Sequence, residues 1–345
     1  PPAGRRGGTP APAAPQQEPG AYEKFLRAAY TAHAVAVIGG QGGRKSTGMH
    51  LTHTGILGFV QYFDEPVVSI APEDQDQLER YLNSGKTPRI HINVQNRVTD
   101  GPVESANVVG EIRGSEHPEQ VVVVGGHLDS WDLATGTTDD GCGVATTLGA
   151  AEAIVRSGIK PRRTIRFVLF TGEEQGLMGS VAYVKNHANE MANHVAAVIL
   201  DSGQGPVVEL NLGGRNDLLG VTRPFGEWIR NYGVTSVTDD VAFGTDTGPF
   251  TLMGLPGIEL GQDSPDYRFT HHSNVDTLDK VDPAIISKDA VVQALVAFWI
   301  ADRPDRYASP WTPDQTRKML ADQGQEPMLR NFGLWDLIGS AAQRQ

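Results

Sequence analysis

Three apolar segments that alternate with helical segments constrain the fold of this chain most strongly. They are VVVVGG at 121–126, TIRFVLF at 164–170 and HVAAVIL at 194–200, and the stretches between them read as helices. Strands that are apolar almost throughout are buried on both faces. Two successive parallel strands need a crossover connection, which is usually a helix. The sequence therefore predicts an α/β fold with a mostly parallel central sheet and helices on both faces.

Composition and pattern divide the chain into four segments. Residues 1–21 are rich in proline and glycine and cannot build a core. Residues 22–104 contain a predicted helix over PEDQDQLERYLNSG and an alternating segment, RIHINVQNRV, that predicts a half-buried strand. Residues 105–302 carry the α/β pattern and end with the long helix DPAIISKDAVVQALVAFWIAD. Residues 303–345 are a polar C-terminal tail without clear periodicity.

Bulk properties exclude several classes of function. Hydrophobic residues make up 39% of the chain, which is typical of a globular enzyme, and the net charge of −12 argues against nucleic-acid binding. No apolar run approaches the roughly 20 residues of a membrane span. The single cysteine, Cys142, excludes an internal disulfide, and we expect it to be a small buried helix residue. The chain opens on Pro1 without a visible signal peptide, so we expect a fragment or a processed form.

One histidine and many carboxylates follow the ends of the three apolar segments. They are His127, Asp129, Asp132, Asp139, Asp140, Glu173, Glu174 and Asp201. The carboxyl ends of parallel strands meet at one edge of the sheet, where ligands bind in such folds. Because like charges held close together cost free energy unless a positive charge lies between them, this edge is predicted to be a cation site.

The types of ligand indicate which ion binds. Imidazole with carboxylate and no thiolate favours zinc, and less often cobalt or manganese, whereas calcium and magnesium prefer all-oxygen shells. FTHHSNVDT supplies a second histidine downstream. Two histidines and three carboxylates suit two metals about 3.5–4 Å apart that share one carboxylate. Of the adjacent Glu173 and Glu174, one can bind metal while the other acts on a water as general base, which gives hydrolysis of an acyl bond.

The motifs GGHLDSWD, DDGCG, EEQG, LDSG, GTD and HHSNVDT stand in the order and spacing of a known family. The chain resembles the di-zinc aminopeptidase and glutamate carboxypeptidase family, strongly over 105–302 and weakly over 22–104. The resemblance implies that residues 22–104 are the remnant of an apical, protease-associated domain with its linker. It also implies a zinc exopeptidase (aminopeptidase, carboxypeptidase or dipeptidase) acting on dipeptides or short peptides, and a secreted or periplasmic homodimer.

The same resemblance assigns roles to individual residues. The ligands of the two zinc ions would be His127, Asp139, Glu174, Asp201 and His272. Asp139 would bridge the ions, and Glu173 would be the general base that takes a proton from the attacking water, a zinc-bridging hydroxide, and passes it to the leaving amine. His272 is preferred over His271 because the family's histidine is usually followed by Ser or Thr.

Four residues have open or secondary interpretations. Asp129 is expected to orient His127 rather than to bind metal. His271 stands where many family members have a tyrosine, and it either donates a hydrogen bond to the tetrahedral intermediate or packs. Asp246 either contacts a substrate amine or caps the helix that follows. Asp140 is either a solvated loop acid or a cap of the helix beside it.

Other functions fit part of this pattern. A one-zinc acyltransferase like glutaminyl cyclase would show similar ligands, and metal stoichiometry with a cyclisation assay would separate it from a peptidase. A non-catalytic, receptor-like binding module would share the architecture but would have lost ligands, and the intact set here argues against it. A metal-stabilised scaffold would not need Glu173 facing a water. Release of amino acids from unblocked dipeptides would exclude both.

Overall fold

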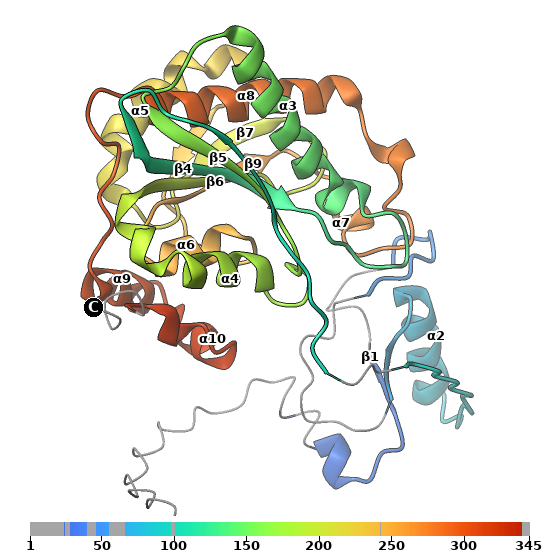
Figure 1. Ribbon diagram of the computed structural model, residues 1–345. Coiled ribbons are helices and arrows are strands. Elements are labelled where there is room, and N and C mark those ends of the chain that lie inside the picture. Colours follow the sequence, from blue (N-terminus) through green and yellow to red (C-terminus); the bar gives the residue numbers. More distant parts are fainter. Residues whose placement is uncertain are drawn as a thin grey trace, which may run out of the picture.

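The computed structural model describes residues 24, 28–39, 46–54, 66–97, 101–241 and 243–339, so the predicted segment 1–21 lies outside the described residues. At its centre is a seven-stranded sheet with the order β3-β5-β4-β6-β9-β7-β8 (Figure 1). The strands are β3 (Val108–Ile112), β4 (His117–His127), β5 (Arg163–Phe170), β6 (His194–Ile199), β7 (Val207–Asn211), β8 (Ser236–Thr238) and β9 (Gly257–Gln262). Strands β5, β4, β6 and β9 are parallel, as predicted, whereas β3 and β7 run antiparallel to β5 and β9.

Helices cover both faces of this sheet (Figure 1). On one face lie α3 (Cys142–Ser157) and α8 (Pro283–Asp302), and on the other lie α4 (Met178–Asn186) and α6 (Thr247–Leu252). Two further α-helices of residues 105–302 are α5 (Leu219–Trp228) and the short α7 (Tyr267–Thr270). The predicted α/β class with helices on both faces is confirmed.

The run of residues 121–124 in β4 shows why a central strand can be apolar at successive positions. Val122 and Val124 belong to the core that includes residues of α3 and α8, whereas Val121 and Val123 belong to the core that includes residues of α4 and α6. Successive side chains of a strand point to opposite faces, so an uninterrupted apolar run fills two cores at once. Helix α3, which lies between two of the predicted strands, ends at Gly158 with a φ of 71°.

Helix α8 is long and apolar enough to cross a membrane by length and composition alone, which the sequence reading did not anticipate. Half of its most apolar window is buried inside the fold. Val292, Val296 and Ile300 of this helix belong to the main core, and α8 packs against α3. Its apolar composition is therefore accounted for by its place in the core.

Residues 22–104, called the first block below, contain few helices and strands among their described residues. Strands β1 (Val37–Gly39) and β2 (Val67–Ser69) pair in parallel, and α2 (Pro72–Asn83) is the predicted helix with acidic residues in its first turn. The predicted strand over RIHINVQNRV is wrong for its described residues 89–97, which have no strand and are mostly exposed. Alternation alone does not make a strand, because a strand needs a partner to satisfy its backbone groups. The assignment of this block to a protease-associated domain stays a prediction.

Residues 303–339 form more structure than their composition indicated. Residue 302 is followed by helices α9 (Pro313–Asp322) and α10 (Glu326–Asn331) and by a 3-10 turn at Trp335–Leu337. Thr312 and Gln315 form a capping box at the start of α9. Leu320, Leu329 and Trp335 bury their side chains with Leu252 of α6, so this segment covers the outer side of that helix.

His194, at the start of β6, leads to a prediction about stability. Its Nδ1 donates to the Glu190 carbonyl at 3.0 Å, and its Nε2 accepts from the Tyr183 hydroxyl at 2.8 Å. Burial lowers its pKa to about 4, below the unfolded value of about 6.5. The neutral imidazole therefore stabilises the fold fully above about pH 6.5, and we expect the stabilisation, about 3 kcal/mol, to be lost as the pH falls toward 4.

We expect His194→Gln, which has no titratable group, to flatten the decline of unfolding free energy between pH 7 and pH 4 by about that amount. Denaturant titrations at several pH values would measure it. His117→Gln, at a half-exposed histidine of the same sheet, is the matched control. An unchanged pH dependence in His194→Gln would contradict the prediction.

Candidate active site

His127 is the last residue of β4, and its ring is fixed by the loop that follows. Nδ1 donates to the Asp129 carbonyl at 2.9 Å, so Nε2 faces the carboxyl edge of the sheet. The predicted orienting role of Asp129 thus involves its backbone, while its carboxylate lies 3.8 Å from Nδ1. That carboxylate instead accepts the N–H groups of Glu173 and Glu174, at 3.2 and 3.3 Å. Asp129 therefore connects the ends of β4 and β5.

Asp139 lies in the turn Thr137–Gly141 between β4 and α3 and is 4% exposed. Its two carboxylate oxygens face different histidines. Oδ1 lies 3.3 Å from Nε2 of His127, and Oδ2 lies 3.2 Å from Nε2 of His272. The turn is held by Asp276, whose carboxylate accepts the N–H groups of Thr138 and Asp139 at 2.6 and 3.2 Å. Asp139 therefore stands between the two histidines.

Asp140, the next residue, is buried beneath this turn. Its Oδ2 accepts the His127 N–H at 3.1 Å, and its Oδ1 accepts the Gly143 N–H in the first turn of α3 at 2.9 Å. Gly143 is required here, because a Cβ at that position would lie 2.1 Å from the same carboxylate. The interpretation of Asp140 as a cap of α3 agrees with this geometry, and the interpretation as a solvated loop acid is wrong.

Glu173 and Glu174 follow β5 and their side chains diverge. Oε2 of Glu174 lies 3.0 Å from Nε2 of His272, whereas Oε2 of Glu173 lies 4.0 Å from Nε2 of His127. Burial, followed by the charge of Asp201, raises the pKa of Glu173 to about 10. Asp201, just after β6, places Oδ1 3.5 Å from Nε2 of His127. The side chains at the carboxyl ends of β4, β5 and β6 therefore lie close together at one edge of the sheet.

His271 and His272 lie just beyond α7, far along the chain from the other donors. Their rings stack at 3.8 Å, and Nε2 of His271 lies 3.9 Å from Oδ2 of Asp139. Two groups of donor atoms, each close enough together to hold one ion, share Asp139: His127–Asp139–Asp201 and Asp139–His271–His272. Nε2 of His272 also lies 3.0 Å from the Glu174 carboxylate.

The donors fit zinc by their chemistry. Nε2 of His127 and Oε1 of Glu174 are buried and make no hydrogen bond within the described structure, so each retains a lone pair or proton position for a ligand. Burial lowers the pKa of the His127 imidazole, but Asp201 and Asp139 outweigh burial and raise that pKa well above its usual value. The site therefore favours positive charge at its centre, which a dication also supplies.

Asp246 lies directly before α6 and is 1% exposed. Its carboxylate makes no capping bond to the helix, so the capping interpretation is wrong. It accepts a hydrogen bond from the Ser180 hydroxyl of α4. Burial, opposed by that bond, raises the pKa of Asp246 to about 7. Contact with a substrate amine stays a prediction for this residue.

Cys142 is the first residue of α3 and is 2% exposed. Burial, with the charge of Asp140, raises the pKa of its thiol to about 12. A thiol with so high a pKa is a poor nucleophile at neutral pH, so the expected structural role of Cys142 is confirmed.

The sequence reading missed Tyr267 and Asp276. Tyr267 opens α7, its ring lies 4.9 Å from that of His271, and its side chain interacts with the Asp139 carboxylate. The ring fits against Gly203, where a Cβ would lie 2.8 Å from it. Tyr267 lies outside every motif quoted above, whereas Asp276 lies within HHSNVDT, so that motif gave the only signal.

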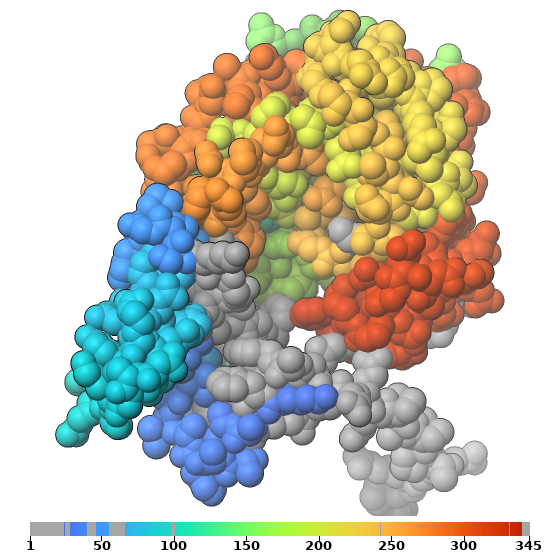
Figure 2. Space-filling view, turned by 180° about the vertical axis from the view of Figure 1, so that it is seen from behind, coloured from blue at the N-terminus to red at the C-terminus, as the bar shows by residue number. Residues whose placement is uncertain are grey.

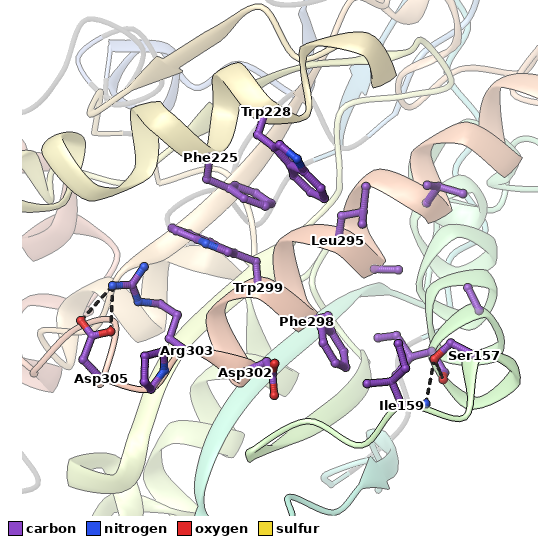
Figure 3. A pocket seen from close by; sticks show the side chains of 15 residues that line it. Ser157, Ile159, Phe225, Trp228, Leu295, Phe298, Trp299, Asp302, Arg303 and Asp305 are labelled. Carbon is purple, nitrogen blue, oxygen red and sulfur yellow. Dashed lines mark hydrogen bonds and ion pairs between the residues drawn. The ribbon is translucent and has the colours of Figure 1, made fainter.

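An apolar pocket of about 730 Å³ lies away from these donors, between α3, α5 and α8. Trp228, Phe298 and Trp299 line it, together with Ser157 at the far end of α3 (Figure 3). Helix α3 begins beside Asp140, and its 16 residues span roughly 24 Å at 1.5 Å per residue. The pocket is therefore too remote to hold a substrate of the donor cluster.

The fold and the donor set are typical of α/β metallopeptidases. The model of peptidase family M28 matches residues 107–296, more than half of the chain. The chain therefore belongs to peptidase family M28.

Relatives of this chain include proteins named carboxypeptidase Q. The protein from Rattus norvegicus is 35% identical over 237 residues, covering 69% of this chain and 50% of its own length. The protein from Homo sapiens is 33% identical over 258 residues, covering 74% of this chain and 54% of its own length. The chain thus spans about half the length of these relatives.

Solved structures agree on the fold. A peptidase M28 precursor from Shewanella amazonensis is 30% identical, with a TM-score of 0.70, and the match covers 81% of this chain and 62% of that one. A zinc aminopeptidase from Bacillus subtilis is 20% identical, with a TM-score of 0.61 over 86% of this chain and 71% of that one, which shows a shared fold alone.

Proposed function

We propose that this chain is a zinc-dependent exopeptidase that hydrolyses the peptide bonds of dipeptides or short peptides. The observation that carries the proposal is the position of Asp139 between two groups of donors, with Glu173 beside them. Membership of family M28 supports the class of reaction, and the names of the relatives support zinc and exopeptidase activity.

We assign His127, Asp139 and Asp201 to one zinc ion, and Asp139, Glu174 and His272 to the other. The short distances within each group support this division. When bound, such ions polarise a carbonyl group and lower the pKa of a water. Cobalt and manganese accept the same nitrogen and oxygen donors and would be able to substitute.

Glu173 is the general base in this proposal. Its carboxyl group lies beside the donors, 4.0 Å from Nε2 of His127, and as a carboxylate it could take a proton from the attacking water and release it to the leaving amine. His271 is part-exposed beside Asp139 and is proposed to donate a hydrogen bond to the oxyanion of the tetrahedral intermediate. Asp246 is proposed to bind the substrate amine. A homodimer and a secreted or periplasmic location are proposals that rest on the family resemblance alone.

Metal removal is the direct test of this function. We expect the purified protein to contain about two zinc ions per chain and to release amino acids from unblocked dipeptides. Chelation should abolish release, and added zinc, cobalt or manganese should restore it. Elemental analysis and a dipeptide panel, run before and after chelation, measure both quantities.

Two results would contradict the proposal. One zinc ion per chain with cyclisation of an N-terminal glutamine peptide would instead identify an acyltransferase like glutaminyl cyclase. Bound zinc without any dipeptide hydrolysis would favour a binding module or a scaffold.

A further inference from the structure

A short segment from the first block, residues 51–54, lies against the loop that carries His271 and His272. The Thr54 N–H donates to the His272 carbonyl at 2.8 Å, and the Asn274 N–H donates to the Thr52 carbonyl at 3.0 Å. The Thr52 N–H donates to the Asn274 side chain at 3.0 Å. These bonds join segments more than 200 residues apart in the sequence. Figure 2 shows N-terminal residues in blue beside orange residues of the later chain.

His53 lies at the centre of this contact and is 4% exposed. It pairs with Ser273 in an isolated antiparallel bridge, and its ring Nδ1 lies 3.0 Å from the His271 carbonyl. Because a carbonyl oxygen only accepts, Nδ1 must donate in this bond. The His53 carbonyl in turn accepts the Ser69 hydroxyl of β2 at 2.8 Å. The histidine loop is thereby connected through His53 to the small sheet of the first block.

The backbone of His272 needs such support. Its φ is 56°, in the left-handed region that a residue with a Cβ rarely adopts. Such a conformation persists only where the surroundings hold it. Here the carbonyls of His271 and His272 both accept bonds from residues 53 and 54, which fixes the two peptide groups on either side of the left-handed residue. The direction of the His272 imidazole toward Asp139 and Glu174 follows from that conformation.

We propose that residues 51–54, through the bond from His53 to the His271 carbonyl, act as a positioning element for His272, so that the first block is a working part of the metal site. This inference rests on the proposed function, since it assumes that His272 binds metal. His53 acts on the metal site through the backbone of the loop that carries His271 and His272. It holds the loop in place. Its loss should lower the affinity for the zinc ion that Glu174 and His272 hold more than the affinity for the other ion.

The test compares two replacements of His53 in the full chain. His53→Leu keeps an apolar side chain of similar bulk but removes the donor. His53→Asn places an amide nitrogen close to where Nδ1 lies and retains the donor. We expect His53→Leu to bind one of the two zinc ions about 10- to 100-fold more weakly, and His53→Asn to bind both ions as the wild type does. Calorimetric titration of zinc into the metal-free protein measures both sites.

His50→Leu is the matched control, because His50 lies in the same region, its side chain is 62% exposed and it pairs with Asp74 instead of the loop. It should bind zinc like the wild type. Asn274→Ala tests the same contact from the other side, because it removes the acceptor of the Thr52 N–H. It should lower the affinity for the same zinc ion. This second variant decides the matter if His53→Leu does not fold.

The outcomes separate this inference from the proposed function. If His53→Leu and Asn274→Ala bind both ions with wild-type affinity, the positioning role is refuted and the peptidase function stands. If His53→Asn is as weak as His53→Leu, the bond to the His271 carbonyl is not what matters, and the inference also fails. If the wild type binds no zinc, the proposed function fails and the inference with it.

Discussion

Glu173→Gln is expected to lower kcat by about 10³-fold while zinc stays bound, because general-base catalysis contributes roughly 10² to 10⁴ to such reactions. The amide keeps the size of the side chain but cannot accept a proton from water. The Glu173 carboxylate lies 4.0 Å from Nε2 of His127, farther than those of Asp139 and Asp201, so its replacement should leave the metal sites intact.

Steady-state kinetics on a dipeptide and zinc analysis of the same sample would measure the two effects. Glu152→Gln, at an exposed position of α3, is the matched control and should keep wild-type turnover. Undiminished turnover in Glu173→Gln would rule out its role as base, and loss of zinc would mean that Glu173 is itself a ligand.

Asp139→Asn should remove metal and activity together. Both carboxylate oxygens of Asp139 face a histidine nitrogen, at 3.3 and 3.2 Å. Asparagine has one oxygen and no charge, so it would serve one ion poorly and leave the other without a shared ligand. We expect the zinc content to fall from about two ions per chain to less than one, and hydrolysis to become undetectable.

Elemental analysis after dialysis, with thermal unfolding in the presence and absence of zinc, would measure this loss. Asp132→Asn, in the same loop at an exposed position, is the control and should retain metal. Full two-zinc occupancy in Asp139→Asn would be incompatible with a bridging role. Together, the Glu173 and Asp139 variants distinguish a residue that acts on the water from one that holds the ions.

The central sheet was predictable because its signals are local. A strand segment buried on both faces must be apolar at each position, as residues 121–124 of β4 are, and the stretches between such segments read as helices, as α3 does. The alternating segment RIHINVQNRV gave an equally clear local signal and was wrong, since its described residues have no partner strand. The helices after Arg303 were missed because their apolar residues are few and are buried by contact with distant parts of the chain, among them α6.

The candidate site also has one part that the sequence predicted and another that only the tertiary structure showed. The sequence by itself determined the strand ends, the residue types that follow them and hence the chemistry of a cation site at one edge of the sheet. Only the tertiary structure decided that Asp276 holds the Asp139 turn, that the Asp129 carboxylate binds backbone N–H groups, and that His53 supports the histidine loop. These contacts join segments that are separated by tens to hundreds of residues. No local pattern encodes such contacts, because they form only when packing of the whole domain brings the segments together.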